Sequence, residues 1–399
     1  IFDEDILKKL PKQDARVEMI LLALSTIDVA MKRNRCNVGK YHGTPKAIFS
    51  KLIKQWNIEK VICNEDYEPY ASERDSEIKT LLEAAGIQFK CYKDQVIFDK
   101  EAVVKGDGTP YKVYTPYSRK WLEKYQETPL QFYPSEVELD SLASNESLPD
   151  LNLSDLGFET SGIAQPEYRF DDTLIDQYEA TRNFPALDQT SRLGAHLRFG
   201  TVSIRRLVNQ ASSRSNNTFL KELIWREFFM QILWHFPYTQ QKSFKPQYER
   251  IIWRNNPDEF EKWCAGETGY PLVDAGMREL NETGFMHNRV RMLVGSFLCK
   301  HLLIDWRWGE AYFAEKLLDY EMSSNVGNWQ WVAGCGVDAA PYFRIFNPSE
   351  QIKKFDKQLQ YIQKWVPNFQ ELDYPSPIVD HKYARERCLT TYKEALNTL

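Results

Sequence analysis

Apolar and polar positions along the chain follow two different periods, and the change of period divides the sequence. Before residue 93, helix-like spacing predicts helices over Asp14–Ala30, Pro45–Trp56 and Ser76–Ala85. Two short runs, Lys60–Asn64 and Ile87–Tyr92, predict strands. Strands that alternate with helices indicate a parallel, Rossmann-like sheet in an α/β domain. Ligands of such sheets bind at the carboxyl ends of the strands.

A polar stretch separates this part from a helical remainder. Pro134 to Gln165 is rich in Ser, Asp, Glu and Asn, which is typical of a connector on the surface. Beyond Asp171 the spacing is helical, and the predicted helices are Asn217–Phe236, Pro271–Glu282, Met286–Ile304 and Gly309–Glu321. We therefore expect an α/β domain over 1–130, a connector over 131–170 and an all-helical domain over 171–399.

Composition excludes several classes of protein. Of 399 residues, 43% are hydrophobic and 27% charged, as in globular proteins of two or three domains. The sequence contains neither an apolar run long enough for a transmembrane helix nor a signal peptide at its start, so we expect no membrane association. The seven cysteines are scattered without a CxxC pair, which predicts reduced thiols in the cytoplasm and no metal site.

Charge is segregated although the net charge is only -5. Pro134–Gln177 holds eleven Asp or Glu and one Arg, whereas Arg182–Arg254 holds twelve Lys or Arg and four Asp or Glu. The second stretch can form a positive face for a polyanion, or it can be an ordinary solvated surface. Eight of the eleven tryptophans lie between Trp225 and Trp331, which indicates a large core or a stacking surface.

Two segments of the helical part leave two interpretations each. Thr190–Gly194 is a loop with two hydroxyls and an arginine, and it predicts either a pyrophosphate site or an ordinary turn, with periodicity resuming near Ser203. Glu222 and Arg226 are four residues apart beside Trp225. They form either an ion pair on a half-buried helix or a stacking plate with two hydrogen-bonding groups for a base.

Two further segments carry polar groups close together. Asn288, Arg291 and Met292 share one helical face, which suits a heteroaromatic ring, although a core methionine and a surface arginine explain it equally. Asp319 and Glu321 bracket a predicted helix end, shortly before Asn325 and a glycine turn. Without a nearby histidine they indicate acceptors for a ligand's N–H and O–H groups, or a solvated helix end.

Taken together, six segments resemble one family. They are Thr190-Ser-Arg-Leu, Glu222-Leu-Ile-Trp-Arg-Glu, Met286-His-Asn-Arg-Val-Arg-Met, Asp305-Trp-Arg-Trp-Gly, Asn325-Val-Gly-Asn-Trp-Gln-Trp and Asp338-Ala-Ala-Pro-Tyr-Phe-Arg-Ile-Phe-Asn-Pro. In this order and spacing the chain resembles the photolyase/cryptochrome family over essentially its whole length, and most closely the class I cyclobutane pyrimidine dimer photolyases.

The resemblance implies an N-terminal antenna domain, whose first strand would precede Ile1, and a helical domain that binds FAD. The positions that match FAD contacts are Tyr178, Thr190, Ser191, Arg192, Leu193, Glu222, Arg226, Asn288, Arg291, Asp319, Glu321 and Asn325. Gly194 stands where many members have serine, and Glu321 where aspartate is usual. A second, antenna chromophore is implied, but its identity is not.

The resemblance also implies the substrate and the reaction. Damaged DNA is the partner, and positions matching contacts to a flipped-out dimer are Arg182, Trp225, Asn288, Arg289, Met292 and Trp331. Residues expected to serve the reaction are Glu222, Asn325 and the electron-transfer chain Trp329, Trp306 and Trp253. Light-excited reduced FAD would donate an electron that splits the dimer, which makes the chain a carbon–carbon lyase.

The resemblance leaves one alternative function open, and it also implies the oligomeric state and the cellular location. A cryptochrome-type blue-light receptor without repair activity shares the scaffold. Asn325, Met292 and Trp331 follow the repair pattern, which favours the lyase. We expect a monomer in the cytoplasm of a bacterium, associated with the nucleoid when it is bound to DNA.

Overall fold

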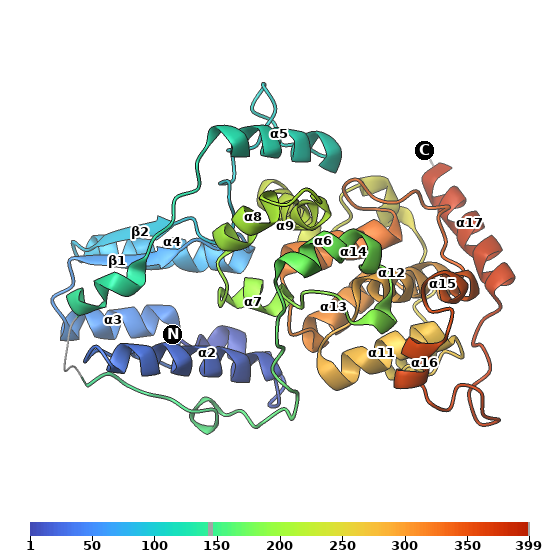
Figure 1. Ribbon diagram of the computed structural model, residues 1–399, viewed down its shortest axis with the longest axis horizontal. Helices are drawn as coiled ribbons and strands as arrows, with labels where there is room; N and C mark the ends of the chain where they lie inside the picture. The colour runs from blue at the N-terminus through green and yellow to red at the C-terminus, as the bar shows by residue number, and fades with distance from the viewer. Residues whose placement is uncertain (143–146, 398–399) are drawn as a thin grey trace. The chain divides into compact units, whose positions relative to one another are not determined.

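The computed structural model describes residues 1–142 and 147–397, which form two compact units (Figure 1). The first unit consists of Ile1–Ile97, Thr128–Gln165 and Phe199–Arg206, and the second of Phe98–Glu127, Pro166–Arg198 and Leu207–Leu399. Helices dominate the fold. None of the helices in the described part of the chain is both long and apolar enough to cross a membrane.

A small parallel sheet forms the centre of the first unit. β1 (Lys60–Asn64) and β2 (Gln88–Tyr92) pair in register, and in each strand half-buried residues alternate with exposed ones. This alternation marks a sheet with one covered face. The helices α3 (Pro45–Gln55) and α4 (Pro69–Ala84) supply the cover, with Leu82 fully buried. The predicted parallel α/β arrangement is confirmed, although α4 begins seven residues earlier than expected, at a proline suited to a first helical turn.

Part of the connector belongs to the core of the first unit. The helix α2 (Ala15–Lys32) follows α1 (Glu4–Leu7), and its face packs against Leu156 and Phe158 from the connector. The connector was expected to run over the surface, and this is wrong for Leu156 and Phe158. Although the stretch is mostly polar, these two apolar side chains are buried in the core. Residues 143–146 of the connector lie outside the described residues.

The second unit is helical, as predicted. Its helices are α5 (Tyr114–Glu127), α6 (Asp172–Thr181), α7 (Gly194–Phe199), α8 (Ile204–Ser212), α9 (Thr218–His235), α10 (Pro257–Ala265), α11 (Pro271–Thr283), α12 (Asn288–Ser296), α13 (Trp306–Lys316), α14 (Met322–Ala333), α15 (Pro348–Phe355), α16 (Gln360–Trp365) and α17 (His381–Asn397). The first residues of α8 are assigned to the first unit. A π-helical turn, Phe297–His301, follows α12.

The range 98–127 packs with the second unit rather than with the sheet that precedes it. The buried carboxylate of Glu227 on α9 accepts hydrogen bonds from the backbone N–H of Phe98 at 3.1 Å and from Nε1 of Trp121 at 2.7 Å. A buried carboxylate needs such donors. The compact units therefore divide the chain differently from the ranges expected from the spacing of apolar residues.

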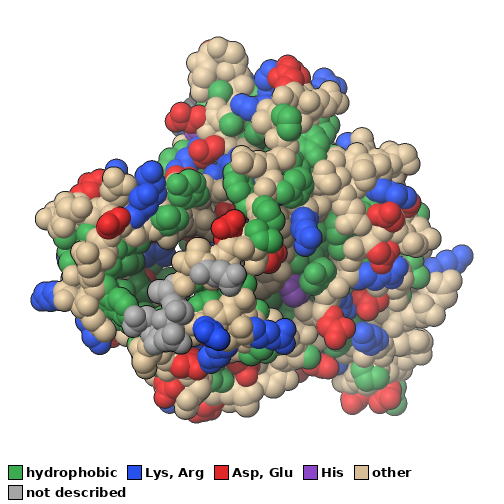
Figure 2. All heavy atoms as spheres, turned by 60° about the vertical axis from the view of Figure 1, so that its left-hand side comes forward, with side chains coloured by type: hydrophobic (Ala, Val, Ile, Leu, Met, Phe, Trp, Pro, Cys, Tyr) green, Lys and Arg blue, Asp and Glu red, His purple; other side chains and the backbone are tan. Residues whose placement is uncertain are grey.

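Charged side chains on the outside are mixed in sign. On the face shown in Figure 2, Lys and Arg side chains are interspersed with Asp and Glu side chains. Several of the arginines counted in the basic stretch are paired with carboxylates, such as Arg214 with Asp172 and Asp176. The excess of positive residues in the sequence therefore does not translate directly into a uniform positive surface.

Two glycines set the spacing of the helices in the second unit. A Cβ atom on Gly309 of α13 would overlap the indole of Trp329 and lie 2.6 Å from Cδ2 of Leu298. A Cβ atom on Gly327 of α14 would overlap the ring of Phe229 on α9. Gly327, predicted to form a turn after Asn325, lies inside α14. A glycine is needed there because α9 packs directly against the backbone of α14.

Substituting Gly309→Ala tests this packing. Alanine improves helix propensity by about 1 kcal/mol, but overpacking a filled core costs about 1–3 kcal/mol, so we expect net destabilisation. Gly106→Ala is the matched control, since a Cβ atom there meets nothing within 4 Å. The apparent unfolding temperature, followed by circular dichroism, should fall for Gly309→Ala only. An unchanged temperature would show that Trp329 moves aside without cost.

Candidate functional site

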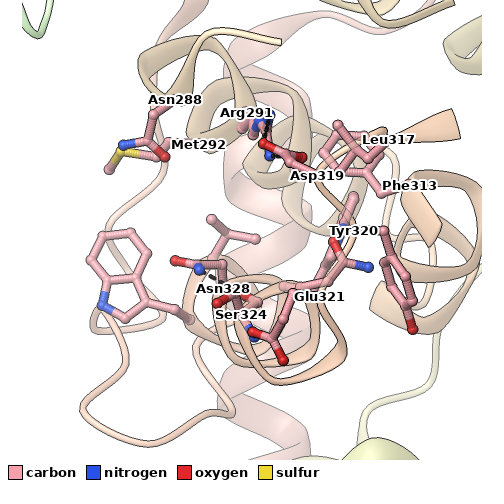
Figure 3. A pocket seen from close by; sticks show the side chains of 15 residues that line it. Asn288, Arg291, Met292, Phe313, Leu317, Asp319, Tyr320, Glu321, Ser324 and Asn328 are labelled. Atoms are coloured by element: carbon pink, nitrogen blue, oxygen red, sulfur yellow. Dashed lines mark hydrogen bonds and ion pairs between the residues drawn. The ribbon is translucent and has the colours of Figure 1, made fainter. Parts of the chain in front are cut away.

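A cavity opens between α12, α14 and the segment that joins α13 to α14 (Figure 3). It encloses about 620 Å³ of space between protein atoms, part of it open to solvent. Eight residues that the sequence singled out line it together: Asn288, Arg291, Met292, Asp319, Glu321, Asn325, Trp329 and Trp331. Lining residues that were not singled out are Gly295, Phe313, Leu317, Tyr320, Ser324, Asn328 and Val332.

The α12 wall carries the predicted polar face. Asn288 and Met292 lie together on one side of the cavity, and Arg291 points to Asp319 (Figure 3). The Arg291 guanidinium forms two hydrogen bonds with the Asp319 carboxylate, at 3.1 and 2.9 Å, and its Nε donates to the carbonyl of Met286 at 2.7 Å. Arg291 is thus held by fixed partners, which leaves Asn288 as the adaptable amide of this wall.

Glu321 is the N-cap of α14. The residue is 7% exposed, and its carboxylate accepts from the backbone N–H groups of Ser323 and Ser324, both at 2.9 Å, and from the Ser323 hydroxyl. Capping satisfies backbone donors that the helix leaves unpaired. Glu321 was predicted to accept hydrogen bonds from a ligand, but its carboxylate already caps α14. The carboxylate of Asp319 likewise already has a partner, the guanidinium of Arg291.

Asn325 lies in the first turns of α14 and points toward α13. Its Nδ2 donates to the carbonyl oxygen of Glu310 at 3.1 Å and to Oε1 of the same residue at 2.9 Å. Because both partners are acceptors, they fix the amide with its nitrogen toward Glu310. Burial raises the pKa of Glu310, while its bond with Asn325 lowers it. Glu310 was not found from the sequence, where a lone glutamate in a helix gives no signal.

The three predicted electron-transfer tryptophans share one core. Trp329 lines the cavity and is 3% exposed, Trp306 is 1% exposed, and Trp253 is half-buried at the edge of the same cluster. The first two tryptophans of the expected chain are thus buried, and the last one, Trp253, is the most exposed of the three. Trp263, which the sequence did not single out, is fully buried with its ring centroid 6.1 Å from that of Trp329.

The other predicted residues do not line the cavity. These are Tyr178, Arg182, Thr190, Ser191, Arg192, Leu193, Glu222, Trp225, Arg226 and Arg289. Trp225 stacks on Tyr114, with ring centroids 3.6 Å apart and planes at 7°. Tyr114 covers one face of the indole, and Trp225 is not among the residues that line this cavity, so its contact with the dimer stays a prediction. Glu222 pairs with Arg182, whose guanidinium lies over the Tyr178 ring at 5.6 Å.

The loop before α7 reaches the cavity wall at its end. Arg192 has a left-handed backbone, φ 54°, and pairs with Asp188 at 2.8 Å. A Cβ atom on Gly194 would lie 2.6 Å from Oδ2 of Asp319, so this glycine permits the contact between the loop and a lining residue. α7 starts at Gly194, whereas helical spacing was expected only near Ser203. A glycine at the first position of a short helix resembles a turn signal, so the pattern of apolar residues does not predict the helix.

Arginines gather next to the cavity. Burial lowers the pKa of Arg289, and the charges of Arg182 and Arg344 lower it further, which places three guanidinium groups near one another. The Arg344 guanidinium lies 5.7 Å from the ring centroid of Trp331, a lining residue. Arg182 is paired with Glu222, whereas no ion pair holds Arg289 or Arg344 among the described residues. Guanidinium groups beside an aromatic wall fit a phosphate-bearing ligand with a stacked ring.

Comparison with known proteins identifies relatives over most of the chain. The family "FAD binding domain of DNA photolyase" matches residues 219–373, and the family "DNA photolyase" matches residues 1–135. "Deoxyribodipyrimidine photo-lyase" of Alkalihalophilus pseudofirmus is 36% identical, over 88% of this chain and 82% of that protein.

Two solved structures are similar as well. The bacterial class III photolyase from Agrobacterium tumefaciens has a TM-score of 0.85 and 33% identity, over 97% of this chain and 90% of that one. The archaeal photolyase from Sulfolobus tokodaii "with two FAD molecules" has a TM-score of 0.79 and 31% identity, over 96% of this chain and 89% of that one.

His287 precedes Asn288 and is the N-cap of α12. Its burial predicts how the stability of the protein depends on pH. Burial lowers the pKa of His287 to about 4 and that of His301 to about 3, so the folded protein keeps both neutral. The unfolded chain takes up these protons below its ordinary pKa, about 6.5. Stability present above pH ~6.5 is therefore lost as the pH falls toward ~4, at up to about 1.4 kcal/mol per unit for each histidine.

His287→Asn should reduce this loss, because asparagine can cap the helix but does not titrate. The variable to measure is the free energy of unfolding in urea at several pH values between 4 and 8. We expect a shallower acid slope for the variant and equal slopes near pH 7.5. Identical slopes throughout would mean that His287 is protonated in the folded protein.

Proposed function

Since this chain belongs to the photolyase/cryptochrome family, we propose that it uses light to repair cyclobutane pyrimidine dimers in DNA, as a deoxyribodipyrimidine photo-lyase. The observation that carries the proposal is that Asn325, Trp329, Trp331 and Met292 line the same cavity. The cavity offers an oriented amide, two indoles and a thioether in one enclosure, beside clustered arginines. Its class within the photolyases stays a prediction.

FAD is the family's cofactor, and the chemistry of the lining residues fits it. The lining combines amide and hydroxyl groups, from Asn288, Ser324 and Asn328, with the apolar Phe313 and Leu317, as a flat ring with polar edges requires. Bound, reduced FAD supplies an electron when it absorbs light. The protein's part is to exclude water and to keep the Asn325 carbonyl in place through Glu310.

The dimer has to leave the DNA duplex to reach an enclosed site. Trp331 and Met292 provide apolar surface for its two bases, while Arg182, Arg289 and Arg344 hold the flanking phosphates. Glu222, paired with Arg182, orients that arginine and can accept a hydrogen bond from a base edge. Tyr178, Thr190, Ser191, Arg192, Leu193 and Arg226 remain proposed FAD contacts.

The remaining parts of the proposal concern organisation and setting. Residues 1–130 serve as the antenna domain, 131–170 as the connector and 171–399 as the FAD and DNA domain. The protein acts as a monomer in the cytoplasm and associates with the nucleoid on damaged DNA. The identity of any second chromophore is left open.

Repair can be measured directly. The reduced holoprotein is mixed with an oligonucleotide that carries one thymine dimer, and the thymine absorbance is followed under blue light and in the dark. We expect recovery in the light only. Trp331→Ala should weaken dimer binding by about 1–3 kcal/mol through lost stacking and leave the FAD content unchanged.

The control for this experiment is Trp234→Ala, whose indole does not line the cavity. It should bind the dimer as the unmodified protein does. Absence of repair by protein that contains reduced FAD would overturn the proposed function and would favour a light receptor.

Trp253→Phe separates reduction of the cofactor from repair. Phenylalanine keeps most of the packing but is much harder to oxidise, so light-driven reduction of the bound flavin by an external thiol should nearly stop. Repair by chemically reduced protein should be unchanged. Trp308→Phe, at a tryptophan that packs against Phe260 outside the predicted chain, should affect neither. If Trp253→Phe abolishes both activities, the role assigned to Trp253 is wrong.

A further inference from the structure

Two cysteines that are far apart in the sequence meet across the sheet of the first unit. Cys63 on β1 lies directly opposite Cys91 on β2, and their Sγ atoms are 3.3 Å apart. The spacing of the cysteines along the chain predicted no metal site, because a CxxC pair is missing. The register of the parallel strands brings the two thiols together instead, side by side on the covered face of the sheet.

A carboxylate completes the group. One carboxylate oxygen of Asp75, on α4, and the two Sγ atoms all lie within 4.8 Å of one another, and all three residues are half-buried. Arg74 contacts Asp75 through Nε at 2.9 Å and through a terminal nitrogen at 2.8 Å, both to Oδ1. The second oxygen, Oδ2, is therefore available as a ligand.

We propose that Cys63, Asp75 and Cys91 bind one zinc ion, with a solvent molecule as the fourth ligand. In tetrahedral zinc sites Zn–S distances are about 2.3 Å and Zn–O distances about 2.0–2.2 Å, so neighbouring ligand atoms are somewhat less than 4 Å apart. The observed group needs only small side-chain movements to reach this geometry. Two sulfur ligands select zinc over magnesium or calcium.

Charge balance supports a divalent ion. Two thiolates and one carboxylate carry three negative charges, a zinc ion reduces the total to one, and Arg74 compensates the rest. Binding releases one proton from each thiol, and no electron is transferred. The ion would link both strands to α4 at the carboxyl end of the sheet, where the covering core is small.

A disulfide fits the same pair less well. Adjacent strands are about 4.7–4.9 Å apart, and side chains directly opposite stand roughly parallel, whereas a disulfide requires a Cβ–Cβ distance of about 3.5–4.5 Å. Closing the bond would pull the strands together. A metal ion tolerates the wider spacing, because it sits between the sulfurs.

Zinc binding can be tested on the reduced, FAD-containing protein after dialysis against a chelator. Titration with zinc, followed by elemental analysis, should give one equivalent per chain. X-ray absorption at the zinc edge should show two sulfur neighbours at about 2.3 Å. Cys63→Ser and Cys91→Ser should each weaken binding at least about 100-fold, since residues that only orient a ligand already contribute about 10- to 100-fold.

Asp75→Asn removes one of the three ligand charges and should weaken binding by at least about 10-fold. Cys264→Ser is the matched control: Cys264 is a half-buried thiol outside the group, and its loss should leave zinc affinity unchanged. FAD content reports whether each variant folds. Zinc binding by Cys63→Ser equal to that of the unmodified protein would overturn the proposal. So would a Cys63–Cys91 disulfide in protein that binds no zinc after reduction.

Discussion

The contact between α13 and α14 determines the geometry of the site. Gly309 has no side chain, so the Trp329 indole lies directly on α13. One turn earlier on α14, Asn325 donates to the carbonyl and the carboxylate of Glu310, the residue after Gly309. Two consecutive residues of one helix thus position both the lining indole and the lining amide. A shift of α14 along α13 would displace the two groups together, which couples the packing of the core to the chemistry of the cavity.

The elements that the sequence predicted well are those with local signals. Asp14 caps α2, Pro45 opens α3, and both strands alternate in burial, so each boundary is visible in a few residues. The helices α7 and α14 escaped prediction because Gly194 and Gly327 resemble turn signals. Each glycine is instead required by a partner distant in the sequence, Asp319 and Phe229, which no local pattern reveals.

The part of the site that lies on a single helix could be predicted from the sequence. Asn288, Arg291 and Met292 follow helical spacing, and the cavity contains all three. Trp225 was predicted from its residue type and the family pattern. Its environment depends on Tyr114, which stacks on it and precedes it by more than 100 residues. Glu310 was missed for the same reason, since only the packing of α14 gives this glutamate a partner.

Charges around the cavity are held by fixed partners, and this bears on electron transfer. Asp319 is paired with Arg291, Glu321 caps a helix, and Glu310 accepts a hydrogen bond from Asn325. Groups that are already satisfied need not reorient when the charge of a ligand changes by one. A preorganised environment of this kind keeps the cost of reorganisation low, in contrast to water, which must turn around each new charge. The same pairs that stabilise the fold therefore also suit the cavity for a reaction that moves a single electron.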